Sequence, residues 1–365
     1  MPKTLQNMFT KNKKITFIES INQALSLSMK KDKNVICYGL GTTDPKKIFG
    51  STKNLEEKFG NKRVFDIPTS ENAMTGIAIG ASLNGLRPIF IHQRLDFCLL
   101  AMDQIINNAA KWHFMFGGQK SVPITIRLIT GRGWGQGPTH SQNLQSLFAH
   151  IPGLKVVMPS NPYNAKGLLL GSIFDNNPVI YIENRWLHNS TQYVPNKFYT
   201  LPIGKAEKKN SGKHITIVSM SYMTVEAIRA SKILNKANIE VEIIDLLSIR
   251  PLDMTSIQRS VRKTGRLLVL DTSHPICSVG SEIISQVVEK SFKFLKASPI
   301  KLNLPDTPEP TSYSLTKNYY NNFKTIVNEC MNIMNFKNKK KIFDILTKEK
   351  VKHHDIPGEW FKGPF

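Results

Sequence analysis

Glu71 is the first residue whose type and position could do chemistry. It is the only carboxylate in the segment PTSENAMTGIAIGAS, which predicts a turn followed by a helix over residues 71–84. An acid at a helix start commonly complements the helix dipole and the free N–H groups there. The small residues behind Glu71 would also let another backbone or subunit approach closely. A carboxylate in such a seam would be partly desolvated, with a raised pKa, and could hold or pass a proton. Both roles stay open.

A glycine-rich run, GRGWGQG, follows the predicted strand PITIRLIT and leads to His140. A dinucleotide-binding loop requires G-x-G-x-x-G at the opening of a helix. Here Gln136 stands where the third glycine is needed and the bulky Trp134 interrupts the run, so we expect a loop over a polar site instead. His140 comes just before a predicted helix that Ser141 could cap. Its place after a strand fits a ligand site as well as a structural role.

The segment HQRLDF, residues 92–97, follows the strand PIFI at the same kind of sheet edge. Arg94 and Asp96 could simply pair, and Phe97 could simply be part of the core. Arg94 could equally hold an anionic substrate, because its guanidinium matches carboxylates and phosphates. Phe97 could stack on a flat heterocycle. In the turn DNNPV, Asp175 and the neighbouring carbonyls are hard oxygen ligands suited to a cation, although the turn itself is ordinary.

Alternating strand and helix patterns must position these residues, and they predict parallel α/β sheets. One long helix is expected in FCLLAMDQIINNAAKWHF, and another is opened by Asn161 with Pro162 in its first turn. The sequence predicts two doubly wound α/β domains with a C-terminal tail. The expected parts are a basic extension over 1–14, a first domain over 15–190, a linker over 191–213, a second domain over 214–336 and a basic tail over 337–365.

Composition narrows the class of protein. The 365 residues carry a formal charge of +22, but the lysines are scattered and no basic stripe is interleaved with aromatics, so a nucleic-acid partner is not expected. No apolar run reaches the ~20 residues that span a bilayer, so no membrane is expected and the cytoplasm is the expected compartment. The four cysteines form no CxxC pair and mostly lie in apolar runs, which predicts buried thiols.

Taken in order, several segments resemble a known family. The family that they resemble is that of the β subunits of the thiamine-diphosphate-dependent decarboxylating component of 2-oxo acid dehydrogenases, a branch of the transketolase superfamily. The resemblance covers roughly residues 15–335, and its spacing is free of gaps from Glu71 to Asn177. It implies a transketolase-like pyrimidine-binding domain followed by a transketolase C-terminal domain. The matching segments are FGNKRVFDIPTSE, GIAIGASLNGLRPI, AMDQIINNAAK, THSQ, IPGLKVVMPS, AKGLLLGSI, DNNPVIYIEN, SIRPLD and VRKTGRLLVLDT.

The resemblance implies a role for each matching residue. Glu71 would hydrogen-bond N1′ of the cofactor's aminopyrimidine ring, and Phe97 would pack on that ring. His140 would handle the substrate or the acyl acceptor. Glu71 and His140 are therefore the expected catalytic residues, with Arg94 beside the substrate. A site for a potassium-type cation is expected at Ile124, Ser172, Asp175 and Asn177.

The sequence lacks the motif that the superfamily uses to bind the pyrophosphate end of the cofactor. The superfamily holds magnesium and pyrophosphate through a GDG motif with a downstream Asn, and no GD dipeptide occurs in these 365 residues. An α subunit carrying that motif is therefore the expected partner, in an α₂β₂ heterotetramer. The chain also departs from the family. It has Leu40 and Gly41 where acidic residues are common, and Arg94 with Asp96 where the run is usually less charged, which implies an altered substrate pocket.

Three functions follow from these residues. The first is decarboxylation of a small 2-oxo acid with transfer of the acyl unit to lipoyl-lysine of an acyltransferase, for which an acidic lipoyl domain would suit the basic surface. The second is a thiamine-diphosphate-dependent carboligase in a specialised pathway. The third is a non-catalytic basic scaffold protein. Acylation of lipoamide would separate the first two.

Overall fold

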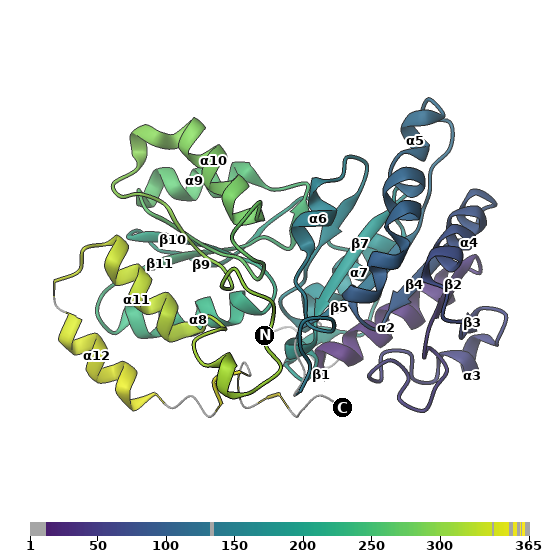
Figure 1. Ribbon diagram of the computed structural model, residues 1–365, viewed down its shortest axis with the longest axis horizontal. Coiled ribbons are helices and arrows are strands. Elements are labelled where there is room, and N and C mark those ends of the chain that lie inside the picture. Colours follow the sequence, from purple (N-terminus) through teal and green to yellow (C-terminus); the bar gives the residue numbers. More distant parts are fainter. Residues whose placement is uncertain are drawn as a thin grey trace, which may run out of the picture. The chain divides into compact units, whose positions relative to one another are not determined.

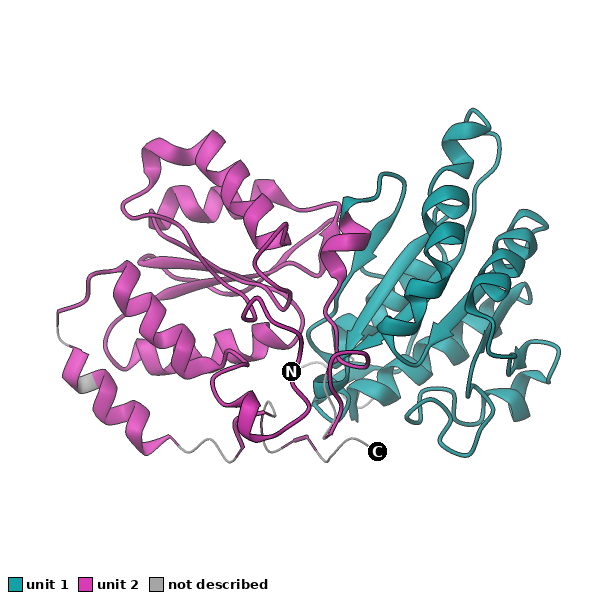
Figure 2. Cartoon of the chain, in the orientation of Figure 1, with its two compact units in different colours: residues 1–130, 150–203, 365 teal, residues 131–149, 204–364 magenta. Residues whose placement is uncertain are grey.

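In the computed structural model, residues 12–131, 135–337, 339–349, 353–355, 358 and 360–361 are described. The chain forms two units (Figure 2). Unit 1 comprises residues 1–130, 150–203 and 365, and unit 2 comprises residues 131–149 and 204–364. The segment 131–149 therefore belongs to unit 2, although the residues directly before and after it belong to unit 1.

Unit 1 is built on parallel strands in the order β6-β7-β5-β4-β2-β3. Every residue of β2, β5 and β7 is buried. This agrees with their near-continuous apolar sequences, because a parallel sheet is covered on both faces. The strands are β2 (Val35–Gly39), β3 (Val64–Phe65), β4 (Arg87–His92), β5 (Thr125–Thr130), β6 (Lys155–Val157) and β7 (Val179–Asn184).

Two helices of unit 1, α4 (Glu71–Leu83) and α7 (Pro162–Ile173), begin where the sequence predicts. In α2 (Phe17–Lys31) a capping box joins Thr16 and Glu19, and in α7 the Asn161 side chain accepts a hydrogen bond from the N–H of Asn164. Helices α2 and α7 pack together, whereas α4 packs on β4 (Figure 1). The short α3 (Leu55–Phe59) ends at Gly60.

The long helix expected over residues 97–114 is wrong. The structure has a 3-10 helix, η1 (Leu95–Ala101), then a π-helix, η2 (Gln104–Ala109), then the four-residue α5 (Trp112–Met115). Leu95, Cys98 and Ala101 are buried, and this repeat of three is the period of a 3-10 helix. The apolar residues of the segment thus carry two different periods, which a single helical pattern does not describe.

The expected linker contains strands. β8 (Thr191–Pro195) pairs antiparallel with β1 (Asn12–Thr16), and both belong to unit 1. β9 (Glu207–Asn210) pairs antiparallel with β11 in unit 2. Polar, proline-containing strands at sheet edges are hard to tell from loops by composition alone.

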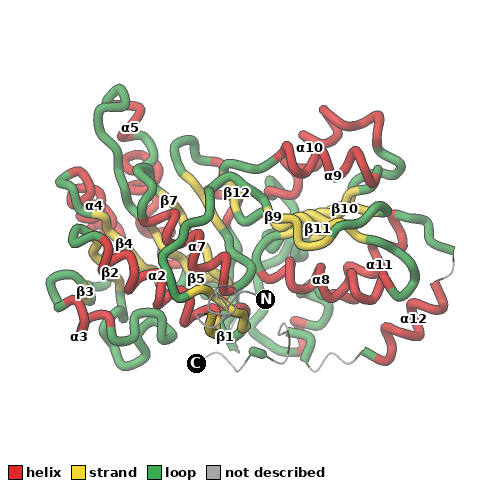
Figure 3. The backbone as a smooth tube through the Cα atoms, turned by 180° about the vertical axis from the view of Figure 1, so that it is seen from behind, coloured by secondary structure: helices red, strands yellow, loops and turns green. Residues whose placement is uncertain are grey.

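Unit 2 is a second α/β layer structure, with strand order β14-β13-β10-β11-β9. Helices α9 and α10 cover one face of the sheet, and α8 and α11 cover the other (Figures 1 and 3). Its strands are β9, β10 (Ile215–Ser219), β11 (Val241–Asp245), β13 (Leu267–Leu270) and β14 (Ile300–Leu302), with β12 (Ser248–Arg250) between α8 and α9 in the chain. Its helices are α6 (Gln145–His150), α8 (Tyr222–Asn235), α9 (Met254–Thr264), α10 (Val279–Ser291), α11 (Phe323–Ile333) and α12 (Lys339–Lys348).

The segment 131–149 is anchored inside unit 2 by Gln145. Its side-chain amide donates to the carboxylate of Asp271 (2.8 Å) and to the hydroxyl of Thr272 (2.9 Å), and all three residues are buried. Asp271 also accepts from the backbone N–H groups of Ser273 and Gly280. In the basic tail, α12 packs on α8, with Ile342 and Leu346 buried.

Two further expectations concern the thiols and the bilayer. Cys37, Cys98 and Cys330 are buried free thiols as predicted, whereas Cys277 is exposed. Cys277 lies in the loop before α10 and not in a strand or helix core. In the described part of the chain, every helix is too short or too polar to cross a membrane.

Candidate active site

A pocket in unit 1 brings Glu71 and Phe97 together. It lies where β2 and β4 end and α4 begins, at the edge of a parallel sheet where ligands bind. Most of its wall is apolar. The residues that line it are Leu40, Ile67, Pro68, Glu71, Phe90, Ile91, His92, Gln93 and Phe97.

Glu71 is the first residue of α4 and is half-buried. The N-cap residue Ser70 makes no side-chain cap hydrogen bond. Tyr38 ties the helix to β2, because its hydroxyl donates to the backbone carbonyl of Met74 (3.3 Å). The opposite side of α4 is open in this chain, with Ile77 57% exposed. The helix is therefore buried along only one side within the chain itself.

The end of β4 supplies two polar side chains to the pocket. His92 is buried with its ring 4.4 Å from that of Phe90, and burial lowers the pKa of His92 to about 3, so the imidazole is neutral at physiological pH. Its Nε2 has no hydrogen-bond partner among the described residues. The Gln93 amide donates to the backbone carbonyl of Leu40, which fixes the loop after β2. Leu40 makes that wall apolar.

Arg94 directly follows the pocket residue Gln93 in the chain and is 3% exposed. Burial lowers its pKa to about 10, against the opposing effect of Asp96, so Arg94 stays charged at neutral pH. It is not alone: Arg185 is 5% exposed, and the guanidinium carbons of both arginines lie over the Phe49 ring, at 5.7 Å for Arg94 and 3.6 Å for Arg185. The sequence analysis singles out Arg94, whereas Arg185 and Phe49 carry no comparable signal in the sequence.

A fully buried ion pair lies beside these arginines. Arg127 on β5 donates to both carboxylate oxygens of Glu183 on β7, at 2.9 and 2.6 Å, and neither side chain is exposed. Although burial opposes ionisation, the Arg127 guanidinium and the His188 hydrogen bond hold the pKa of Glu183 at about 2. Arg127 also donates to the Ser51 hydroxyl (2.8 Å), which joins the strands to the loop that carries Phe49.

His140 belongs to unit 2, whereas Glu71, Phe97 and Arg94 belong to unit 1. It is exposed, and its Nδ1 lies 3.0 Å from the Thr139 hydroxyl. Ser141 does not cap a helix, because α6 begins only at Gln145. In the glycine run, Gly133 and Trp134 lie outside the described residues.

The four residues predicted to hold a cation meet around one turn of unit 1. The carbonyl of Ile124 accepts from the N–H of Val179, and that of Ser172 accepts from the N–H of Asp175. Asp175 also binds two side-chain cations: its carboxylate lies 2.6 Å from the Lys155 ammonium, and its carbonyl lies 2.9 Å from the Arg87 guanidinium. The Asn177 N–H donates to the Asp175 carboxylate (2.9 Å).

Comparison with known proteins gives two domain families. Residues 13–189 match the transketolase pyrimidine-binding domain, and residues 204–326 match the transketolase C-terminal domain. A solved structure described as a split-gene transketolase, inactive β4 tetramer, superposes with a TM-score of 0.70 over 88% of this chain and 99% of that chain. At 20% identity, this likeness supports the fold.

Closer relatives are similar over most of both chains. The chain is 39% identical to the β subunit of acetoin:2,6-dichlorophenolindophenol oxidoreductase from Bacillus subtilis, covering 84% of this chain and 93% of that one. It is 41% identical to the Cupriavidus necator protein of the same description, covering 84% and 94%. It is also 38% identical to the pyruvate dehydrogenase E1 component subunit beta of Porphyra purpurea, covering 88% and 97%.

Proposed function

Because the chain belongs to the transketolase-like family that includes the β subunits of thiamine-diphosphate-dependent 2-oxo acid dehydrogenases, we propose that it is the subunit that activates the cofactor in such an enzyme. The observation that carries the proposal is the pocket that holds Glu71 and Phe97 together. The relatives favour this function over the carboligase and the scaffold.

The residues of the pocket fit an aminopyrimidine ring. The aromatic and aliphatic walls suit a flat, weakly polar heterocycle, and the carboxyl group of Glu71, when protonated, can donate a hydrogen bond to a ring nitrogen. When bound, thiamine diphosphate supplies the electron sink for decarboxylation of a 2-oxo acid. The work of this chain is to hold a proton at the Glu71 carboxylate, to orient the ring with Phe97, and to keep water from it. His140 is proposed to act on the substrate or the acyl acceptor.

The partner is proposed to be an α subunit with the GDG motif, in an α₂β₂ heterotetramer that also holds most of the contacts to Mg²⁺. Two features support this proposal: the chain has no GD dipeptide, and α4 leaves Ala73 and Ile77 exposed close to Glu71. No cluster of three or more metal-binding side chains occurs in the part of the chain that the structure describes. The acyl acceptor is proposed to be a lipoyl group on an acidic partner domain.

A direct test uses the partner captured from the native source with tagged full-length chain. Magnesium thiamine diphosphate is titrated into the complex and into the isolated chain, and the rate of lipoamide acylation is measured. We expect tight binding in the complex alone, and at least a 100-fold slower turnover for Glu71→Gln with unchanged assembly. Glu57→Gln, at an exposed acid of α3, is the matched control. Near-normal turnover of Glu71→Gln would contradict the mechanism.

The potassium-type site at Ile124, Ser172, Asp175 and Asn177 remains a proposal. It is supported by the gathering of these residues at one turn, although Lys155 and Arg87 already bind Asp175. We expect a higher melting temperature in potassium chloride than in choline chloride at equal ionic strength. Equal melting temperatures would indicate that the two side-chain cations replace the ion.

A further inference from the structure

His92 brings to the pocket wall a nitrogen that has no hydrogen-bond partner. The residue ends β4, is 4% exposed and lines the pocket together with Glu71 and Phe97. Its Nε2 is unpaired within the part of the chain that the structure describes. Because burial keeps the imidazole neutral, the ring has one N–H donor and one acceptor nitrogen. A buried polar group without a partner lowers stability, so packing alone does not account for a histidine at this position.

The neighbouring pocket residues do not pair with this nitrogen. Three of the lining residues, Glu71, His92 and Gln93, have polar side chains. The Gln93 amide nitrogen already donates to the backbone carbonyl of Leu40. The Phe90 ring, whose centroid lies 4.4 Å from that of the imidazole, contacts His92 without offering it a hydrogen bond. The remaining candidate for a partner is a molecule bound in the pocket.

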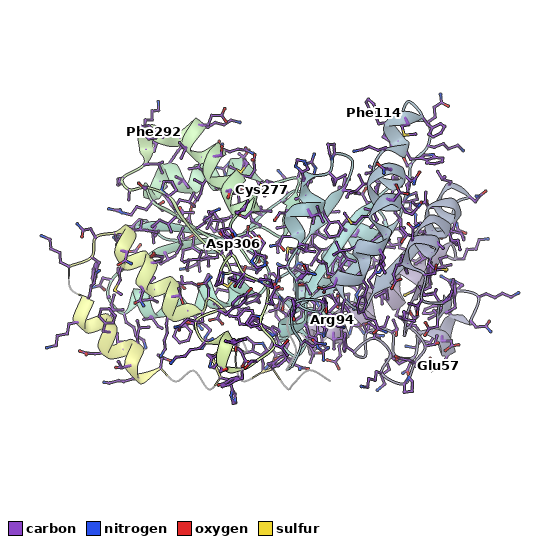
Figure 4. The ribbon with its side chains drawn as sticks, in the orientation of Figure 1. Glu57, Arg94, Phe114, Cys277, Phe292 and Asp306 are labelled. Carbon is purple, nitrogen blue, oxygen red and sulfur yellow. The ribbon has the colours of Figure 1, made fainter. Side chains whose placement is uncertain are left out.

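The place of His92 in the sheet agrees with a ligand contact. β4 lies between β2 and β5, and ligands of parallel α/β sheets bind at the carboxyl ends of the strands. The chain stays buried beyond this strand end: Arg94, two residues after His92, lies within unit 1, whereas Glu57 and Phe114 lie at the periphery of that unit (Figure 4). His92 therefore faces the interior of the unit and not its outer surface.

An aminopyrimidine ring has two polar edges that need partners. The proposed function assigns one edge, N1′, to Glu71. The opposite edge carries N3′, which accepts a hydrogen bond, and the 4′-amino group, which donates one. Glu71 begins α4 and His92 ends β4, and these two elements pack against each other. The pocket thus has one polar side chain from each of two elements, as a ring held at both edges requires.

We propose that His92 binds the edge of the aminopyrimidine that carries N3′ and the 4′-amino group. Nε2 donates to N3′ in one imidazole tautomer and accepts from the amino group in the other. With Glu71 at N1′, this contact fixes the ring in its own plane, while Phe97 packs on its face. The inference rests on the proposed function, because it concerns the same ring that Glu71 is proposed to bind.

Ring analogues test the inference on the full-length chain. Calorimetric titration compares 4-amino-5-aminomethyl-2-methylpyrimidine with 4-amino-5-aminomethyl-2-methylpyridine, in which C–H replaces N3′, and with 5-aminomethyl-2-methylpyrimidine, which lacks the amino group. His92→Phe keeps an aromatic ring and removes both nitrogens. We expect this variant to bind the first probe about 10-fold more weakly. Its melting temperature should be unchanged or higher, because an unpaired buried polar atom is gone.

The analogues identify the atom that His92 contacts. The effect of His92→Phe should fall below 2-fold for the probe that lacks this atom, as in a double-mutant cycle. Loss of the effect with the pyridine indicates donation to N3′, and loss with the amino-free probe indicates acceptance from the amino group. An effect of equal size on all three probes would contradict the contact. His150→Phe, the same substitution at an exposed histidine, is the control and should leave every affinity unchanged.

Nuclear magnetic resonance gives a readout that does not depend on affinity. In chain labelled with ¹⁵N-histidine, the signals of His92 are those absent from the His92→Phe variant. Saturation with the first probe should move the Nε2 resonance of His92. If this resonance does not move and His92→Phe changes affinity less than 2-fold, the imidazole only packs on Phe90 and the inference is wrong.

Glu71→Gln separates this inference from the proposed function. Binding that depends on His92 but not on Glu71 would contradict the proposed role of Glu71 and leave the inference intact. Binding that depends on Glu71 but not on His92 would contradict only the inference. If none of the probes binds the full-length chain, the inference is wrong, and the lipoamide assay still decides the proposed function.

Discussion

Substitution within the buried pair of Arg127 and Glu183 should strongly lower the folding stability of unit 1. We expect Arg127→Met to lower the free energy of unfolding by about 3–5 kcal/mol, because Glu183 would keep its charge in the core without its main partner. The pKa of Glu183, held at about 2 against an ordinary 4.5, gives an independent figure of about 3 kcal/mol for the stabilisation of its ionised form. The two figures agree within their precision.

Urea unfolding followed by tryptophan fluorescence is the appropriate assay, since the buried Trp186 follows Glu183 closely in the chain. The double variant Arg127→Met with Glu183→Leu should regain more than half of the lost stability, because neither member of this ion pair is left in the core without the other. Lys213→Met, which removes an exposed pair with Glu240, is the control and should cost less than about 1 kcal/mol.

Acid unfolding gives the sign of the same interaction. A carboxylate with a lowered folded pKa stabilises the fold fully above its unfolded value and loses that contribution as pH falls toward the folded value. The advantage of the wild type over the double variant should therefore shrink between about pH 4.5 and pH 2. A loss below about 1 kcal/mol for Arg127→Met, or a double variant no more stable than the single one, would refute this reasoning.

Three further outcomes are expected. Glu71→Gln should leave the melting temperature of the isolated chain unchanged within error, as should Glu57→Gln, whereas a marked drop for Glu71→Gln alone would point to a structural role. Asn161→Ala removes the N-cap of α7 and should cost about 1 kcal/mol in urea unfolding, and no change would mean that water replaces the cap. The folded pKa of His92 is about 3 and its unfolded pKa is about 6.5, so between these values the unfolded chain binds a proton that the folded chain does not. The free energy of unfolding should therefore decrease by about 1.4 kcal/mol for each unit by which the pH is lowered from 6.5 toward 3. His92→Phe should flatten this dependence, and an unchanged pH profile would contradict the burial of a neutral imidazole.

Local signals in the sequence predict much of the fold. Asn161 before Pro162 marks the start of α7, and the apolar runs mark the buried strands, because capping and burial depend on neighbouring residues. The segment after Phe97 was predicted wrongly, since its repeat of three buried residues belongs to a 3-10 helix. The exchange of residues 131–149 between units was also missed, because it depends on the distant acceptor Asp271.

In the candidate site too, some residues could be predicted from the local sequence and others could not. Glu71 and Phe97 could be found from their places after strand ends and from the family resemblance, and the pocket unites them. Arg185 and Phe49 could not, since nothing near them in the sequence signals a ligand. Only folding brings them to Arg94. The clue in the sequence is an arginine within two residues of each of two strand ends, in HQR and ENR.

The excursion of residues 131–149 sets a limit on how this protein can be divided. A fragment ending at residue 203 looks like a natural module, yet it would carry away the amide of Gln145 and leave the Asp271 carboxylate in the other piece without that donor. The remainder, beginning at residue 204, would lack α6. If unit 2 were exchanged for that of a relative, residues 131–149 would therefore have to be exchanged together with residues 204–364. The same holds if the gene were split at this point. Each unit is compact, but neither unit corresponds to one continuous stretch of the sequence.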